Sequence, residues 1–535
     1  MGGFFHLPAE IRGMIYRDYV AVEGGYVCDT DAFIKGKLKQ ADGQPICIAL
    51  ILTCKCVAEE MYGLALRVNP ITFSTLCGDP DLRYLAQRFD HLVHDVMDHR
   101  REYINHVWMR VSKEGYTKLR ALHPHFPMLL DRLQNGQRLP LFTMCGPNGE
   151  PASAVRQFLE DMMKEAASSN PHRLERRFLS SLHHTLGGLE RLALTTASYE
   201  ASLEPWNIVW PDEMDELSIF AYGFTGLPPM LPRPETGEAD RSEWRFSAAA
   251  TAIHFLKSLP DTVRCHLRKL VLLEDKQAAP FQESHGLGLI PFCKENPLLR
   301  IERRVSLWNN AFHESRSSTF LFETPQDQYE RLIRLDKNSL DSSLVTASVA
   351  PWIMEALALA PAGMPASSFS LLLDGNPLPQ LCTSIFQSVV QRDLCWQSAM
   401  LEAVKHNGIS DDGTMLYFMS GSDKGEFGWK GLPQAMKDIA SGNSIVRFNF
   451  DIGEPLDPTR LVFEHQNWTW GTWIEKWHER DIMCWETEPP LPSWRDILKE
   501  NVHNDPVEEI EDDGSQNWYY DYEDEVVELQ LLLLG

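Results

Sequence analysis

The sequence predicts an α+β protein, in which a helical N-terminal module packs on a larger body of mixed helices and strands. Two observations lead to this prediction. Several long segments repeat apolar residues at helical spacing, whereas short segments such as 71–74 and 267–272 are alternating or almost continuously apolar, as strands are. The 535 residues are also enough for several domains, and 44% of them are hydrophobic, as in an ordinary globular chain.

A short amphipathic helix is predicted at the start of the chain. Pro8 suits the first helical position, and Glu10 lies in the first turn, where a negative charge favours the helix dipole. Apolar residues then recur on one face: Ile11, Met14, Ile15 and Tyr19.

A second helix is predicted to open at Pro45 and to run to about Leu66, with Cys54 as a core residue of this helix. Asn69 and Pro70 mark a turn after it, and residues 71–74 read as a short strand. The order of the first elements is therefore helix, helix, strand.

This order resembles the start of a group of fungal F-box-like proteins. The resemblance covers residues 4–76 and rests on Leu7-Pro8-Ala9-Glu10-Ile11-Arg12-x-x-Ile15-Tyr16, on Leu52-Thr53-Cys54-Lys55 and on Asn69-x-x-x-Phe73. It implies that one helix face binds the Skp-type adaptor of a cullin ubiquitin ligase, while the body recruits a protein substrate. The residues implied in adaptor binding are Leu7, Pro8, Ile11 and Ile15. The alternative is that these four pack on the protein's own second helix.

Later segments give a coarse domain plan. The plan is an F-box-like module with its following helix at 1–112, a mixed α/β segment at 113–225, a Pro-rich loop or linker at 226–242, an α/β body with a Trp-rich end at 243–499, and an acidic tail at 500–535. Long helices are predicted at 82–111 and 379–406, and another is predicted from a Ser242 cap to Leu259.

Three segments share the form apolar-x-x-Leu-x-apolar: 189–194, 214–219 and 267–272. Their spacing is close to one and two periods of a leucine-rich repeat. Irregular leucine-rich-type strands are therefore one interpretation, and strands of an ordinary sheet fed by helices are the other.

The sequence predicts no enzyme, because it contains no zinc-protease helix, serine elbow, phosphate-binding loop or dinucleotide fingerprint. A site assembled only by folding stays open as an alternative. The metal candidates are weak: His91, His94, Asp95 and Asp98 share one helical face, but a solvated face of an amphipathic helix explains all of them and is the favoured interpretation. We therefore expect no cofactor.

Two features near the C-terminus offer another function, a scaffold without a ligase link. Six tryptophans fall between residues 468 and 494, where they could build either a core or a partner groove; Trp473 and Trp477 stand one helical turn apart, as core residues would. Residues 500–535 contain twelve acidic side chains and no Lys or Arg, which is typical of a solvating tail. The tail could also bind a basic partner.

The net charge of −25 argues against nucleic acid and anionic lipid as partners. No apolar run approaches the roughly 20 residues of a membrane span, and no signal-peptide pattern follows Met1. The eleven cysteines are dilute and odd in number, as in a reducing compartment. We expect a protein of the cytoplasm or nucleus.

Overall fold

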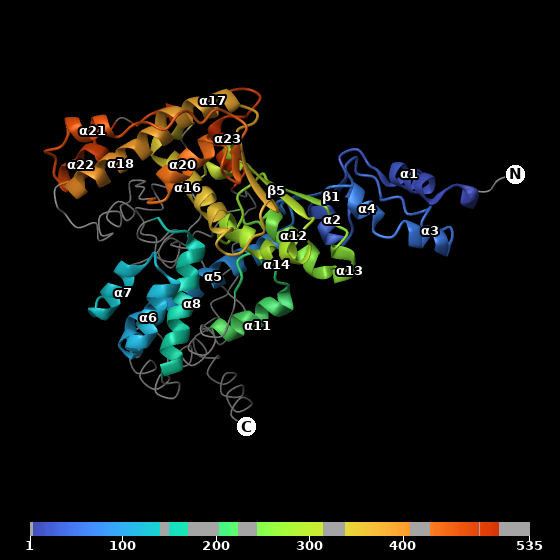
Figure 1. Ribbon diagram of the computed structural model, residues 1–535, viewed down its shortest axis with the longest axis horizontal. Helices are drawn as coiled ribbons and strands as arrows, with labels where there is room; N and C mark the ends of the chain where they lie inside the picture. The colour runs from blue at the N-terminus through green and yellow to red at the C-terminus, as the bar shows by residue number, and fades with distance from the viewer. Residues whose placement is uncertain are drawn as a thin grey trace, which may run out of the picture.

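The computed structural model describes residues 4–139, 149–169, 203–222, 243–313, 338–406, 429–480 and 482–501. The predicted α+β class is confirmed, since helices surround one large sheet and a second, two-stranded sheet is formed by β6 and β9. Figure 1 shows α1, α3 and α4 together at one end of the molecule, beyond β1.

Within the described ranges the central sheet has seven strands in the order β2-β1-β3-β4-β5-β7-β8. Neighbouring strands are parallel except for the antiparallel pair β1 and β2. Apart from β2, the strands cross the sheet in chain order, so β1 and β3 of the N-terminal region belong to the same sheet as β4 of the body. The bounds are β1 Tyr26–Cys28, β2 Lys39–Gln40, β3 Ile71–Ser74, β4 Lys269–Glu274, β5 Arg300–Ser306, β7 Phe369–Asp374 and β8 Val446–Phe448.

The two faces of this sheet differ in burial. Side chains of β3, β5 and β7 alternate between buried and half-buried positions, because successive residues of a strand point to opposite faces. The buried face shares one core with α12 (Ala248–Ser258), α14 (Ile290–Glu295) and α16 (Ser342–Ala358). The other face, called here the half-exposed sheet face, carries Thr72, Ser74, Leu273, Glu302, Arg304, Ser370, Leu372 and Arg447.

Helix α12 begins later than predicted. Its N-cap is Ser247, whose Oγ accepts a hydrogen bond of 2.9 Å from the backbone N–H of Ala250, whereas Ser242 lies outside the described residues. A hydroxyl three residues before a free amide satisfies one of the donors that every helix start leaves unpaired. Its buried side chains include Ala249, Ala250, Ile253 and Leu256.

Helices α5 (Pro80–Val107), α6 (Lys113–Leu122), α7 (Pro127–Gln134) and α8 (Ala152–Ser169) contribute to a second core, around Leu130 and Phe158. Figure 1 shows these helices grouped on the side of the molecule away from α1. The long helix predicted at 82–111 is confirmed by α5, which is 28 residues long. Among the described helices none is both long and apolar enough to cross a bilayer.

The helix predicted at 379–406 is confirmed as α17 (Pro379–Ile385), a π-helical turn at Phe386–Val390 and α18 (Gln391–His406). The Trp473 and Trp477 side chains of α22 (Trp470–His478) are buried, and their rings pack on Trp396 with centroids 5.1 and 5.9 Å away. The predicted core role of these two tryptophans is confirmed. Other elements of the described chain are α2 Thr30–Ile34, α11 Pro211–Tyr222, α13 Asp261–Arg264, α20 Leu432–Ala440, α21 Thr459–Glu464, α23 Trp494–Lys499, β6 Leu340–Asp341 and β9 Cys484–Trp485.

The single helix predicted from Pro45 to Leu66 is wrong. The structure has two short helices instead, α3 (Lys55–Glu60) and α4 (Leu64–Val68), and residues 45–54 are turns or extended chain. Gly63 separates the helices because its φ of +66° belongs to a left-handed conformation that an α-helix cannot contain. Cys54 is an exposed residue at the N-cap of α3, so its predicted place in the core is also wrong.

The segments proposed as leucine-rich-type strands do not share one secondary structure. Segment 267–272 enters β4, as both interpretations require, but segment 214–219 lies inside α11 and is not a strand. Pro211 at the start of α11, followed by Asp212 and Glu213 in its first turn, favours a helix N-terminus at this point. Segment 189–194, the whole loop predicted at 226–242 and the tail beyond 501 lie outside the described residues.

Candidate protein-binding surface

Helix α1 (Ala9–Val20) has two apolar faces, and only one of them is buried. Tyr16 and Val20 are nearly inaccessible and pack in a small core with Val57 and Met61. This small core attaches α1 to α3 and α4. The sequence pattern identified one apolar stripe, whereas the residues that anchor the helix lie on the face opposite to it.

The predicted stripe faces solvent. The exposed fractions of Leu7, Ile11, Met14, Ile15 and Tyr19 lie between 37% and 60%, and Pro8 is exposed as well. The alternative that Leu7, Pro8, Ile11 and Ile15 pack on the protein's own second helix is therefore contradicted. We call Leu7, Pro8, Ile11, Met14 and Ile15 the α1 stripe.

Arg12 fixes the α1 stripe to the neighbouring helix. Its Nε donates a 3.0 Å hydrogen bond to Glu60 of α3, and its Nη1 donates one of 2.6 Å to the carbonyl oxygen of Leu7. The hydrogen bond from Arg12 lowers the pKa of the Glu60 carboxyl to about 2. Because the pair stays charged above that pH, the residues leading into α1 are held in one position relative to α3.

Tyr19 closes the C-terminal end of this face. Its hydroxyl lies 3.0 Å from the Cys47 thiol and accepts a 3.2 Å hydrogen bond from the backbone N–H of Leu50. The hydrogen bond with Tyr19 lowers the pKa of the Cys47 thiol. Both side chains also line a cavity of about 640 Å³ that reaches Glu23 and Asp42.

Two of the four metal candidates, His91 and His94, have described side chains. Helix α5 carries all of them: His91, His94, Asp95 and Asp98. His94 is buried, with Nδ1 2.8 Å from the carbonyl oxygen of Asp90 and its ring 4.4 Å from Phe281, so the expected solvated surface is wrong there. Asp95 and Asp98 have no described side-chain position. In the part of the chain that the structure describes, no three ligating side chains gather.

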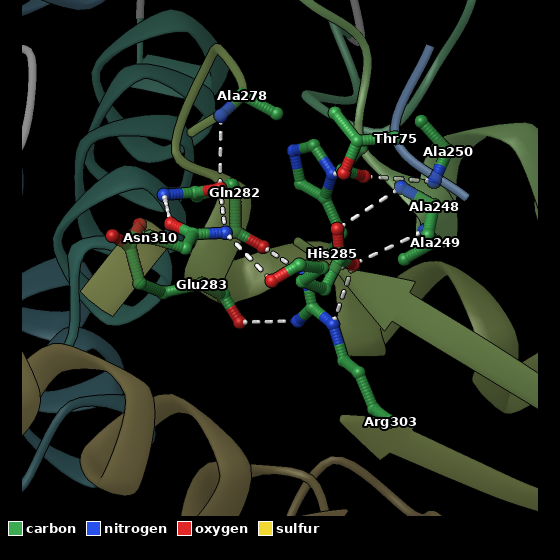
Figure 2. A network of polar contacts seen from close by, with 12 residues as sticks. Thr75, Ala248, Ala249, Ala250, Ala278, Gln282, Glu283, His285, Arg303 and Asn310 are labelled. Carbon is green, nitrogen blue, oxygen red and sulfur yellow. Dashed lines mark hydrogen bonds and ion pairs between the residues drawn. The ribbon is translucent and has the colours of Figure 1, made fainter. Parts of the chain in front are cut away.

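A buried polar network lies beside β4 and β5 (Figure 2). Arg303 of β5 forms an ion pair of 2.7 Å with Glu274, the last residue of β4, and both side chains are almost inaccessible. Glu274 also accepts hydrogen bonds of 3.0 and 3.2 Å from the N–H groups of Ala248 and Ala249. These amides open α12, so the carboxylate meets both a guanidinium and the positive end of a helix.

Arg303 has further partners that complete its hydrogen bonding. It donates to the carbonyl oxygens of Gln282 at 2.6 Å and of Glu283 at 3.1 Å. Its guanidinium also lies over the ring of Trp352, 4.8 Å from the centroid. Since the charge and the donors are satisfied by the protein itself, the network is a structural element that joins β4, β5 and α12.

The Ser247 and His285 pair has the composition of a nucleophile and its base. Ser247 Oγ lies 2.6 Å from His285 Nδ1, and His285 Nε2 lies 2.7 Å from the carbonyl oxygen of Pro280. Both residues have no accessible surface, and burial lowers the pKa of His285 to about 3. A substrate would have to enter a closed core, so we interpret the pair as part of the α12 cap.

Sequence reasoning missed this network. A signal was present in β5. Arg303 is two residues from both Ile301 and Val305, so its side chain lies on the same face of the strand as theirs and points to the core. Its partner Glu274 ends the apolar run Leu270 to Leu273. The pairing itself becomes visible only when β4 and β5 are placed side by side.

Comparison of the chain with protein-family models finds no match, and comparisons with curated proteins and with solved structures find no match either.

Proposed function

We propose that the protein binds the Skp-type adaptor of a cullin ubiquitin ligase through the α1 stripe and recruits a protein substrate through its larger body. The observation that carries this proposal is the orientation of α1. Tyr16 and Val20 anchor the helix, while Leu7, Ile11 and Ile15 lie on the solvent side. An amphipathic helix that presents apolar side chains at such spacing suits a groove of a partner protein.

A few exposed apolar side chains on a short helix are enough to give such binding its affinity. Burying the exposed part of Leu7, Ile11 or Ile15 contributes about 1 kcal/mol for each side chain, and a few well-packed anchors usually carry most of an interface's affinity. Phe5, half of whose surface is exposed, precedes the stripe and adds apolar area. Because Arg12 and Glu60 already hold this region in place, it loses little conformational freedom when a partner binds.

The connection between α1 and α3 supports a recruiting role. The intervening residues form β1, α2 and β2, and β1 pairs with β3 in the central sheet. A partner bound to the stripe is therefore held in a fixed relation to the sheet. The half-exposed sheet face, with Glu302, Arg304 and Arg447 among polar and apolar neighbours, is the surface that we assign to the recruited protein.

The full-length chain can be titrated with a purified Skp-type adaptor by calorimetry. The variant Ile11→Asp/Ile15→Asp should bind at least about tenfold more weakly, because two anchors become charged. The matched control Ile34→Asp/Ile482→Asp changes two isoleucines elsewhere that are 55% and 62% exposed, and it should bind as the parent does. Circular dichroism and thermal midpoints verify folding. A parent chain that fails to bind, or a stripe variant that binds equally well, contradicts the proposal.

A further inference from the structure

A basic cluster lies where α4 meets the amino-terminal ends of β4 and β5. Its members are Arg67, His266, Arg268, Lys269 and Arg300; we call them the junction cluster. They are close in space: the Arg300 N–H donates to the carbonyl oxygen of Arg268 at 2.8 Å, and Lys269 is the strand partner of Arg300. The His266 ring packs 5.1 Å from the ring of Tyr62, whose carbonyl oxygen accepts from Arg67.

The lowered pKa of His266 also indicates that positive charges lie close to it. Burial lowers the pKa of this imidazole most, and the positive charges of Arg67 and Arg268 lower it further. Both guanidinium groups are thus near enough to oppose another positive charge. A cluster of cations is unusual in a chain whose net charge is −25.

The three arginines of the junction cluster have no carboxylate within ion-pair distance among the described residues, whereas Lys269 pairs with Glu302 at 3.5 Å. They are instead held by main-chain oxygens. Arg268 Nη1 donates to Cys265 and Leu267, and Arg300 Nη1 donates to Pro297 and Leu299.

Each guanidinium has five N–H donors, so most of them stay available and already oriented. Arg67 and Arg300 are exposed and Arg268 is half-buried. Such forks suit carboxylates, which they bind by two parallel hydrogen bonds.

We propose that the junction cluster binds the acidic C-terminal tail of the same chain, residues 502–535. Charge complementarity carries the assignment, since this segment holds eleven Asp and Glu and neither Lys nor Arg. The described chain ends at Asn501, which accepts a 2.7 Å hydrogen bond from Arg245, next to the carboxyl end of β4. The cluster lies at the other end of that strand, about 20 Å away.

The reach of the tail exceeds that separation. About ten of its 34 residues, if extended, span some 33 Å. A tethered anion also acts at an effective concentration in the millimolar range, whereas the net negative charge of the molecule repels a separate acidic partner. The tail is therefore favoured over an acidic segment of another protein as the occupant.

Zero-length carbodiimide coupling of the full chain tests this assignment. The reagent joins a lysine amine to a carboxylate in direct contact, and mass spectrometry maps the pairs. Lys269 should couple to carboxylates between Asp505 and Glu528, and Arg300→Lys should add a second coupling site. Exposed Lys430, outside the cluster, is the control and should give at most a small yield. The coupling should fall steeply at 1 M salt, where charges are screened beyond about 3 Å.

Charge reversal makes the result decisive. The variant Arg67→Glu/Arg300→Glu should lower coupling of Lys269 to the tail by about fivefold or more, whereas Arg460→Glu, at an 83% exposed arginine of α21, should not. An equal mixture of isotopically heavy and light protein should give unmixed products. Mixed heavy and light pairs, coupling that survives charge reversal, or no tail coupling in a protein with a normal thermal midpoint would each overturn the assignment. None of these outcomes depends on adaptor binding.

Discussion

The imidazole ring of His266 occupies the space that a β-carbon on Gly63 would need. Gly63 has a φ of +66° and joins α3 to α4, while His266 precedes β4, so this contact joins the N-terminal helices to the body of the protein. The glycine is thus required for two independent reasons, its backbone conformation and the proximity of the ring.

Substituting this glycine should separate those two reasons. We expect Gly63→Ala to lower the free energy of unfolding by about 2–4 kcal/mol, because strain in a left-handed residue adds to a steric clash. Gly36→Ala is the matched control: φ is +60° and nothing lies near its β position, so only about 1 kcal/mol should be lost. Urea unfolding of both variants measures the difference, and equal losses would contradict the packing argument.

Breaking the buried ion pair should be costly. Glu274→Gln leaves the Arg303 guanidinium charged and unpaired in the core, and we expect a loss of about 3–5 kcal/mol in unfolding free energy. The neighbouring strand offers a control, since Glu302→Gln removes a carboxylate that pairs with Arg304 on the half-exposed sheet face and should cost at most about 1 kcal/mol. Similar losses in the two variants would show that burial of the pair has no energetic role.

The α12 cap can be tested at a single hydroxyl. Ser247→Ala removes the acceptor for the Ala250 N–H and the partner of His285, so we expect a loss of about 1–2 kcal/mol. Ser258→Ala, at the exposed end of the same helix, should change stability by less than about 0.5 kcal/mol. Thermal and denaturant unfolding measure both values, and a neutral Ser247→Ala would remove the structural interpretation of the Ser247 and His285 pair.

Glu283 should make stability depend on pH near neutrality. Burial raises the pKa of this carboxyl to about 7, whereas an unfolded glutamate titrates near 4.3. His285, whose pKa burial lowers, adds stability as pH rises to about 6.5. Glu283 acts oppositely: between about pH 4.5 and 7 its folded carboxyl keeps a proton that the unfolded chain has lost, so its contribution to the unfolding free energy decreases as pH rises through this window. Glu355 and Asp393, whose pKa values burial also raises, act in the same direction.

Replacing the titrating group tests this assignment. We expect Glu283→Gln to make the slope of unfolding free energy against pH more positive between about pH 4.5 and 7, and to recover about 1–3 kcal/mol at pH 8 relative to the parent. Exposed Glu454→Gln should leave the slope unchanged. Urea titrations at several pH values provide the measurement, and an unchanged slope in Glu283→Gln would assign the dependence to other groups.

Much of the secondary structure could be predicted because its causes are local. The apolar spacing in α1, the alternation in β3 and the length of α5 are all present in consecutive residues. The break at Gly63 was missed, since one glycine inside an apolar helical pattern is usually tolerated. The approach of the His266 ring, some two hundred residues later in the chain, becomes visible only in the folded structure.

For the candidate site, the sequence predicted which residues take part but not which way they face. The sequence identified Leu7, Ile11 and Ile15 as an apolar stripe, but helical spacing cannot say which of two apolar faces meets the protein's own core. The structure assigns that role to Tyr16 and Val20. The junction cluster was also beyond sequence reasoning, because Arg67 and Arg268 are brought together by the pairing of β3 with β4.

The adjacency of β3 and β4 has a consequence for protein synthesis. The Thr75 hydroxyl at the end of β3 donates to the carbonyl oxygen of Leu273 in β4, 198 residues further along the chain. At about 5–20 residues per second, a ribosome needs roughly 10–40 s to make the intervening chain. During that interval β3 has an unpaired edge, which makes it a principal place where a nascent chain can aggregate or recruit a chaperone.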